Sequence, residues 1–306
     1  MDNFLDKIFF RSRNLDYISQ NLINLTTQTP AKRIFEALNT YSESSEVRYV
    51  GGCVRKVIKK ETVDDIDLAT NLVPSEVCDA LKKQNINFYE TGIQHGTITA
   101  IIDDHKYEIT SLRKDVSTDG RHAKVEFSSD WKEDAARRDF SINSIYSDKN
   151  GNLFDPYNGK KDLESGNINF IGESENRIKE DYLRILRYVR FFINYSNHGH
   201  DLNIIRKIKK NIGGVSKLSS ERLLDEFKKL TKSNAFLKIF NDKISLELIE
   251  IIFPQLKNLE NFKKLNSHAI HNLVKVDFIF LLSLLIVDGS DNTCLLYTSD
   301  AADEGL

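Results

Sequence analysis

The chain has 306 residues, of which 43 are basic and 45 acidic, giving a formal net charge of −2 at pH 7. This balance creates no global field that would attract nucleic acid, so any RNA contact depends on a local patch. Cys53, Cys78 and Cys294 form no CxxC pair, which argues against a zinc site or a disulfide framework. The sequence shows neither a secretory leader nor an apolar run long enough to cross a bilayer. We therefore expect a soluble cytoplasmic protein with a sizeable core.

The first half of the chain alternates between two hydrophobic periods. A period of three to four residues predicts helices within 1–30 and over 31–38, 54–60 and 74–84, with Ser75 as the cap of the last. Apolar and β-branched runs predict strands over 47–50, 98–102 and 106–110. Interleaved strands and helices indicate a head that contains a mixed sheet flanked by helices. From 235 to 287 the pattern is helical and apolar, which predicts an all-α body.

The stretch 49–70, YVGGCVRKVIKKETVDDIDLAT, reads as a strand, a Gly-Gly turn, a helix and a second strand. Gly51 and Gly52 let backbone amides approach an anion, with Arg55 one turn further on. On the second strand, Asp65 and Asp67 would face the same way and repel each other unless a cation such as Mg²⁺ lies between them. An isolated DxD is usually a solvated turn, but its coupling to the glycines favours phosphoryl or nucleotidyl transfer.

This pattern resembles the signature of the DNA polymerase beta superfamily, specifically the bacterial-type (class II) tRNA nucleotidyltransferase and poly(A) polymerase family. The resemblance implies an α+β fold in which an all-α neck and body follow the head. It also implies that Asp65 and Asp67 hold two Mg²⁺ ions and that Gly52 and Arg55 bind the nucleotide. Glu108, in the motif YEITSLR, would be a third catalytic acid if its strand lies beside the strand that carries Asp67.

A second motif, AARRDFSINSIY over 135–146, resembles the family's RRDFTINAL block. Adjacent arginines are commonly surface charge, but here they enter an apolar segment that we expect to be helical. The resemblance assigns Arg138 to the triphosphate, where bidentate geometry favours arginine over lysine. It makes Asp139 a candidate for the ribose hydroxyl.

A third motif, EDYLRILRYVRF over 180–191, predicts a helix with Asp181, Arg184 and Arg187 on one broad face. Without further context the pair Asp181 and Arg184 would be an ordinary intrahelical ion pair. The resemblance instead implies an amino-acid template that reads the Watson–Crick edge of CTP or ATP. Cytosine and adenine both offer an amine donor and a ring-nitrogen acceptor, which a carboxylate and a guanidinium match. Arg187 and Arg190 would support the phosphates or the template.

Several other segments carry weaker expectations. The family's counterpart of 116–127 is a flexible loop, and this stretch is polar and turn-rich. The basic residues between 206 and 217 are ordinarily a solvated face, but in a tRNA enzyme they are candidates for phosphate contact. His198 and His200 lack a third partner nearby and are more typical of a surface loop than of a zinc site. The terminal segment 293–306 resembles translated adapter sequence, so we exclude it and expect the natural chain to continue.

The resemblance predicts a catalytic head over 1–150, a helical neck with the template over 151–230, a helical body over 231–292 and an artefactual tail over 293–306. The expected activity is addition of CCA to the 3′ end of tRNA, with no membrane and no stable protein partner. Poly(A) polymerases of the family carry an Arg-Arg-Phe-Arg-like segment where this chain has GIQHGT over 92–97. Poly(A) tailing, C-only or A-only addition and an inactive RNA-binding relative remain alternatives.

Overall fold

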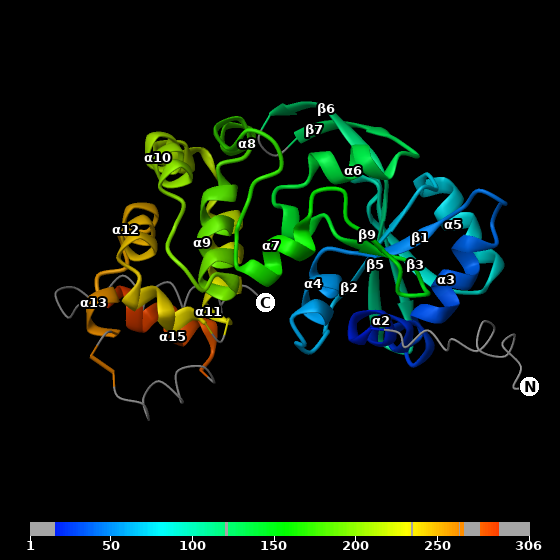
Figure 1. Ribbon diagram of the computed structural model, residues 1–306, viewed down its shortest axis with the longest axis horizontal. Coiled ribbons are helices and arrows are strands. Elements are labelled where there is room, and N and C mark those ends of the chain that lie inside the picture. The colour runs from blue at the N-terminus through cyan, green and yellow to red at the C-terminus, as the bar shows by residue number, and fades with distance from the viewer. Residues whose placement is uncertain (1–15, 120–121, 234, 263, 266–275, 288–306) are drawn as a thin grey trace, which may run out of the picture. The chain divides into compact units, whose positions relative to one another are not determined.

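A computed structural model describes residues 16–119, 122–233, 235–262, 264–265 and 276–287. It divides into two compact units. The first comprises residues 1–164 with 169–172, and the second comprises residues 165–168 with 173–306. Each unit is described separately below, because their relative placement is not determined (Figure 1).

The first unit is built on a mixed sheet with strand order β3-β4-β5-β2-β1-β8-β9. Only β2 and β5 run parallel among its paired neighbours. The strands are β1 (Val47–Val50), β2 (Ile66–Thr70), β3 (Asn87–Gly92), β4 (Thr97–Ile102), β5 (His105–Ser111), β8 (Tyr146–Ser147) and β9 (Leu153–Phe154). Asp103 and Asp104 have positive φ angles of 49° and 62°, which makes the tight hairpin between β4 and β5.

One face of the sheet carries the main core of this unit (Figure 1). Its helices are α2 (Tyr17–Thr27), α3 (Ala31–Asn39), α4 (Gly52–Ile58) and α5 (Pro74–Lys83). Alternate strand residues such as Leu68 and Ile109 are fully buried against these helices. The intervening residues, including Asp67 and Glu108, therefore face the other side of the sheet. That side carries α6 (Trp131–Arg137) and a small cluster around Tyr146.

The helices and strands predicted over 31–60 and 74–110 agree with the structure in type and place. Three differences are described here, and two more, at Asp65 and after Arg137, are described with the site. Strand β3 was not predicted, because its sequence NFYETG lacks an alternating apolar pattern. Helix α5 begins two residues earlier than a Ser75 cap would require: Val73 occupies the N-cap, and the Glu76 side chain accepts a hydrogen bond from the Val73 backbone amide at 3.0 Å.

The third difference is the segment expected to be a loop. Residues 116–119 and 122–127 belong to a two-stranded antiparallel sheet formed by β6 (Arg113–Asp119) and β7 (His122–Phe127). The sequence of this segment is mostly polar, so its hydrophobic pattern gave no signal for a strand.

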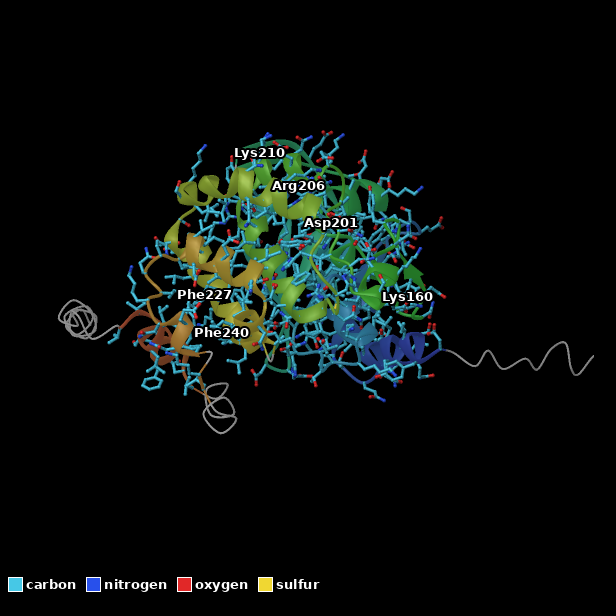
Figure 2. The ribbon with its side chains drawn as sticks, turned by 60° about the vertical axis from the view of Figure 1, so that its left-hand side comes forward. Lys160, Asp201, Arg206, Lys210, Phe227 and Phe240 are labelled. Carbon is cyan, nitrogen blue, oxygen red and sulfur yellow. The ribbon has the colours of Figure 1, made fainter. Side chains whose placement is uncertain are left out.

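The second unit is helical, as predicted. Its elements are α8 (Ser174–Glu180), α9 (Leu183–Tyr195), α10 (Leu202–Asn211), α11 (Ser220–Thr231), α12 (Lys243–Ile252), α13 (Leu259–Phe262), α15 (Phe278–Ile286) and the 3₁₀ helices 212–217 and 236–241; α7 (Gly159–Ser165) precedes them. Phe227 and Phe240 lie among these helices (Figure 2), and Phe227 packs on Phe253 with ring centroids 4.7 Å apart. None of the described helices is long and apolar enough to span a membrane.

Candidate active site

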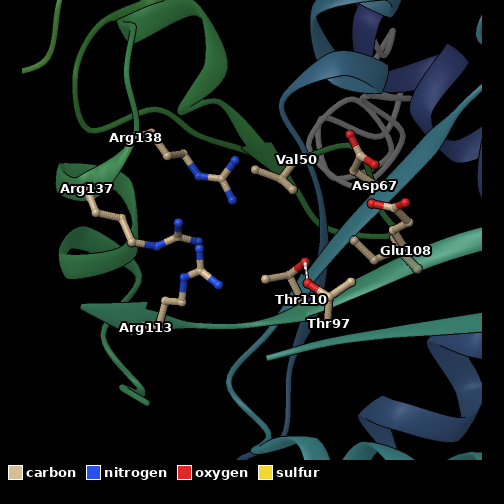
Figure 3. A pocket seen from close by; sticks show the side chains of 9 residues that line it. Val50, Asp67, Thr97, Glu108, Thr110, Arg113, Arg137 and Arg138 are labelled. Carbon is tan, nitrogen blue, oxygen red and sulfur yellow. Dashed lines mark hydrogen bonds between the residues drawn. The ribbon is translucent and has the colours of Figure 1, made fainter. Parts of the chain in front are cut away.

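Two carboxylates meet on the parallel pair of strands. In the register between β2 and β5, Asp67 is the direct partner of Glu108. Adjacent partners on one face of a sheet bring their side chains together. Glu108 thus lies where the sequence required it to lie for a shared acidic site, and Figure 3 shows the two carboxylates side by side.

Asp65 occupies a different kind of position from the predicted one. Strand β2 begins at Ile66, so Asp65 is an exposed residue just before the strand. Its backbone amide donates to Asp64 Oδ1 at 3.0 Å, and Asp64 is paired with Lys56. This local Asp-turn bond competes with strand pairing and delays the start of β2.

The acidic pair is electrostatically unfavourable as it stands. Burial raises the pKa of Asp67, and the negative charge of Glu108 raises it further, with a smaller contribution from Asp65. Arg138 and Arg55 oppose these effects without cancelling them. The three acids are therefore close enough to influence one another, and a bound cation would relieve the repulsion between them.

The Gly-Gly turn leaves space beside Asp67. Gly51 adopts a φ of +66°, which favours glycine. A Cβ on Gly52 would lie 3.7 Å from Asp67 Oδ2, and one on Gly51 would lie 3.7 Å from Arg138 Nη1. A side chain at either glycine would therefore fill the space between the turn, the acid and the arginine, where a phosphate group would otherwise fit.

Arg55 and Asp139 are joined beneath this turn. Both are buried, with 8% of each residue exposed. Arg55 donates to Asn143 Oδ1, and Asn143 Nδ2 donates to Asp139 Oδ1 at 2.8 Å. The sequence motif gave no role to Asn143, which links the two predicted nucleotide-binding residues. The sequence feature that could have identified Asn143 is its spacing of four residues from Asp139.

Arg138 is held by a buried acid that sequence reasoning missed. Asp134 is 1% exposed and accepts from Arg138 Nη2 at 3.1 Å, from Arg137 Nε at 2.8 Å and from the Tyr146 hydroxyl at 2.6 Å. Burial opposes ionisation of Asp134, but Arg138 and Arg137 outweigh it and lower the pKa to about 2. The helical spacing of three and four residues between this acid and the two arginines could have identified it.

The helix predicted to continue through Phe140 and Ile145 is wrong. Helix α6 ends at Arg137, Arg138 is extended, and only a 3₁₀ turn over Ser141–Asn143 follows. The Asp139 carboxylate accepts from the Phe140 amide at 2.9 Å, a local bond that competes with helical pairing. From this extended position the Arg138 Nε donates to the Tyr146 hydroxyl at 2.9 Å, and its guanidinium remains paired with Asp134.

A pocket of about 250 Å³ extends along the sheet from the acids (Figure 3). Asp67 and Glu108 line it together with Arg113, Arg137 and Arg138. Its remaining walls come from neighbouring strands: Val50, Leu68, Thr97 and Thr110.

The donor set suits a hard divalent cation. Mg²⁺ is usually held by one or two carboxylates together with substrate phosphates and water. Asp67 and Asp65 offer such carboxylates, and the raised pKa of Asp67 shows that this place lacks a full counter-charge. No group of three or more His, Cys, Asp or Glu side chains in the described ranges is arranged to hold an ion by itself. Any Mg²⁺ here would therefore need oxygen ligands from a substrate.

In the second unit, Asp181 and Arg184 lie on different elements, so the prediction of a shared helix face is wrong. Asp181 is the extended residue between α8 and α9, and its Oδ1 accepts from the Leu183 amide at 3.2 Å. Its Oδ2 accepts from Arg222 of α11 at 2.8 Å. Arg184, in the first turn of α9, donates to Glu180 at 2.8 Å and to the Arg177 carbonyl at 2.6 Å.

Arg187 and Arg190 follow on α9 and lie near Phe191. The Arg190 guanidinium stacks 4.3 Å from the Phe191 ring centroid and pairs with the buried Glu226. The Arg187 guanidinium is 5.8 Å from the same ring. Arg190 therefore has a structural role in joining α9 to α11.

Two further predictions concern the helical unit. Most of the basic cluster is paired with acids: Lys207 with Glu173, Lys209 with Glu247, and Lys210 with Glu175. These pairs leave less of its charge available to phosphates. Figure 2 shows Arg206 and Lys210 on α10.

His200 is not in a surface loop, because its side chain is only 2% exposed. It bonds Asp242 at 2.6 Å and stacks on Phe192. It is a satisfied core histidine.

The mixed sheet with paired acids on adjacent strands, beside a Gly-Gly turn and an arginine cluster, defines the class of the first unit as a nucleotidyltransferase head. Two family profiles match the chain. The one described as "Poly A polymerase head domain" matches residues 47–169, and the one described as "Probable RNA and SrmB- binding site of polymerase A" matches residues 202–260.

Relatives and solved structures agree with this class. The human mitochondrial CCA tRNA nucleotidyltransferase 1 is 39% identical over 74% of this chain and 53% of its own length. The CCA-adding enzyme of Staphylococcus haemolyticus is 32% identical over 87% of this chain and 63% of its own length. The chain thus spans between about half and two thirds of these relatives.

The CCA-adding enzyme of Bacillus stearothermophilus, solved in complex with CTP, has a TM-score of 0.63 at 23% identity. It covers 83% of this chain, and the chain covers 67% of it. At this identity the likeness shows the fold alone. Together with the profiles and relatives, it supports one identification: the chain belongs to the tRNA nucleotidyltransferase and poly(A) polymerase family.

Proposed function

We propose that this protein is a template-independent RNA nucleotidyltransferase that adds C and A, from CTP and ATP, to the 3′ end of tRNA. The observation that carries the proposal is the pairing of Asp67 with Glu108 on adjacent parallel strands, next to the Gly-Gly turn. The names of the relatives support the choice of tRNA as substrate, since they are called CCA-adding enzymes or CCA tRNA nucleotidyltransferases.

In the head, the chain's own residues bind and orient the two reacting groups. Gly52, Arg55 and Arg138 hold the triphosphate, with Arg138 fixed by Asp134 and with Arg55 acting from beneath the turn. Asp139 serves the ribose of the nucleotide. Glu108 orients the attacking 3′-hydroxyl and accepts its hydrogen bond. Two Mg²⁺ ions, held by Asp65 and Asp67 with substrate oxygens, would supply charge stabilisation at the phosphate.

In the helical unit, Asp181 and Arg184 choose the base. Arg222 and Glu180 already hold these side chains in defined positions, which supports a reading site organised before the nucleotide binds. Uracil and guanine would present a carbonyl where the carboxylate expects an amine, leaving an unsatisfied acceptor. Arg187 and Arg190 support this template from the following turns of α9.

The test is incubation of the protein with tRNA lacking its terminal CCA, Mg²⁺ and single nucleotides. Incorporation of C followed by A supports the proposal. Long A tracts on generic RNA would identify a poly(A) polymerase, and use of only one nucleotide would identify a C-only or A-only enzyme. RNA binding without incorporation would identify an inactive relative. Asp65→Ala should abolish transfer while retaining part of the CTP binding.

The proposal also covers the functions of the domains and the cellular location of the protein. We assign catalysis to the head over 1–150, base selection to the neck over 151–230 and RNA support to the body over 231–292. The terminal segment 293–306 lies outside the described residues. Cys53 and Cys78 are buried free thiols, which supports a reducing compartment such as the cytoplasm.

A further inference from the structure

The pocket beside the acids is larger than the proposed function uses. Four of its polar residues have no role in that function: Thr97 on β4, Thr110 on β5, Arg113 at the start of β6 and Arg137 at the end of α6. Only Val50 and Leu68 are apolar among the residues that line it, and none of these residues is aromatic. Such a lining suits a charged, hydroxylated ligand and offers no ring on which a base could stack.

The polar groups follow one another in a fixed order along the pocket (Figure 3). Asp67 and Glu108 lie at one end, and the guanidinium groups of Arg113 and Arg137 lie at the other. Between them, the hydroxyls of Thr97 and Thr110 are 3.1 Å apart. The pocket therefore runs from carboxylates through hydroxyls to guanidinium groups.

This order matches one end of an RNA chain. Guanidinium groups bind phosphate in a forked geometry, and threonine hydroxyls can donate to or accept from a ribose hydroxyl. A carboxylate accepts from the 3′-hydroxyl that must be activated for attack. The terminal nucleotide of RNA carries a phosphate, a 2′-hydroxyl and a 3′-hydroxyl in the same succession.

Both arginines are oriented by the fold before any ligand binds. Arg113 donates to the carbonyl of His95, the last residue of the 3₁₀ helix Ile93–His95 that precedes β4. Arg137 Nε donates to Asp134 Oδ1 at 2.8 Å. Since less rotamer freedom would be lost on binding, such pre-oriented guanidinium groups favour a specific phosphate contact.

We propose that this pocket binds the sugar-phosphate of the 3′-terminal nucleotide of the RNA that is extended. Arg113 and Arg137 contact its phosphate, and the pair Thr97 and Thr110 contacts its ribose 2′-hydroxyl. The inference rests on the proposed function and adds the position of the primer. It also explains how one site accepts an RNA end whose last base changes after each addition: the base is not read there.

The phosphates of the incoming nucleotide share the same chemistry, but the structure offers them a different place. The Gly-Gly turn lies on the β1 and α4 side of Asp67, whereas Thr97, Thr110 and Arg113 come from β4, β5 and β6. The two substrates would thus approach the acids from opposite sides. The experiment separates them by measuring each substrate independently.

The first test compares Arg113→Gln with Arg33→Gln, an exposed arginine of α3 in the same unit that undergoes the same loss of charge. We expect Arg113→Gln to raise KM for tRNA lacking CCA about tenfold, the effect of losing one charge-assisted phosphate contact. The slope of log binding constant against log salt concentration for RNA should become shallower by about one, the value expected for one lost phosphate contact. KM for CTP should change less than twofold, and Arg33→Gln should behave as wild type in every measurement.

A rise in KM for CTP with unchanged KM for RNA would overturn the proposal in favour of the incoming nucleotide. Unchanged KM values for both substrates would overturn it as well. Because Arg113 also supports the 3₁₀ helix that ends at His95, the melting temperature of the variant must accompany these measurements.

The second test compares two RNAs on the same protein variant, so a general loss of stability would affect both equally. Thr110→Val keeps the shape of the side chain and removes its hydroxyl. Fluorescence anisotropy without nucleotide measures binding of two RNAs that differ only in a 2′-hydroxyl or a 2′-hydrogen on the last residue. Wild type should prefer the hydroxyl form several-fold, and Thr110→Val should bind both equally. Equal binding by wild type, or a preference retained by the variant, would contradict the ribose contact.

The binding assay also separates this inference from the proposed function. If wild type binds RNA with these preferences but incorporates no nucleotide, the proposed activity fails and the primer pocket stands. If wild type incorporates C and A while the variants bind RNA as wild type does, the pocket assignment fails alone.

Discussion

Asp67 on β2 and Asp134 on α6 are both withdrawn from solvent, yet their pKa values shift in opposite directions. Burial and Glu108 raise the pKa of Asp67. Burial also opposes ionisation of Asp134, but two arginines overcome it and lower the pKa to about 2. The chain supplies Asp134 with its own counter-charge and places Asp67 beside a second acid. Under the proposed function, this contrast separates a structural carboxylate from the one proposed to bind a cation and substrate.

The largest effect is expected from neutralising Asp67, the acid whose pKa is raised. Asp67→Asn should lower nucleotide incorporation by about 10³-fold, because the metal-binding charge at the reacting phosphate is lost. In metal-free buffer the same change should raise the melting temperature by about 2 °C, since it removes repulsion with Glu108. Incorporation assays and calorimetry on one preparation check both effects. A variant that is both inactive and clearly less stable would contradict the contrast.

Asp134→Asn tests the other side. Removing a buried acid that binds Arg137 and Arg138 should destabilise the protein by about 3 kcal/mol. Urea denaturation measures this loss, and the exposed pair of Lys229 and Asp225 provides a control. Asp225→Asn should change stability by less than about 0.5 kcal/mol. Equal effects of the two substitutions would show that Asp134 is not a structural anchor.

Arg184→Ala extends the comparison to the helical unit, where Arg184 is paired with Glu180 and Asp181 is paired with Arg222. We expect the preference for C over U to fall by about tenfold to a hundredfold, because the guanidinium that reads the base is removed. Single-nucleotide incorporation with CTP and UTP measures the ratio. Loss of all activity with an unchanged ratio would count against base reading by this residue.

The smallest effect is a dependence on pH. The lowered pKa of Asp134 contributes stability that is present above its ordinary value of 3.8 and is lost as the pH falls towards about 2. Asp67 has the opposite sign: its raised pKa costs stability at neutral pH, and the cost disappears below 3.8. Between pH 7 and 2, the difference in unfolding free energy between wild type and Asp67→Asn should therefore close first, by about pH 3.8, and the difference between wild type and Asp134→Asn should shrink only below 3.8. Constant differences over this range would contradict the assigned shifts.

Much of the head was predictable because local pattern and packing agree there. Strand β1 and helix α3 have clear hydrophobic periods, and β2 and β5 could be placed side by side from the motif containing Glu108. The polar pair of β6 and β7 was missed because its strands are joined by a backbone ladder and its sequence shows no alternating apolar pattern. Sequence period carries no signal for such a ladder.

The local geometry around the candidate site residues was not predictable from the sequence. The side chains of Asp64, Asp139 and Asp181 each accept a hydrogen bond from a nearby backbone amide at a point where no regular element continues. Aspartate side chains compete with helix and strand pairing in this way, so elements expected to run through them end instead. The supporting partners Asp134 and Arg222 come from other elements, and only the folded chain brings them into contact.

The most direct test of the central claim is a thermal-shift titration with Mg²⁺ and CTP on wild type and Asp67→Asn. Because a ligand that binds only the folded state stabilises it, wild type should gain several degrees in melting temperature when both are added. Asp67→Asn, whose uncharged amide cannot provide the same hard ligand, should gain much less. An equal gain in the two proteins would show that the acidic pair is not the place where the cation and nucleotide bind.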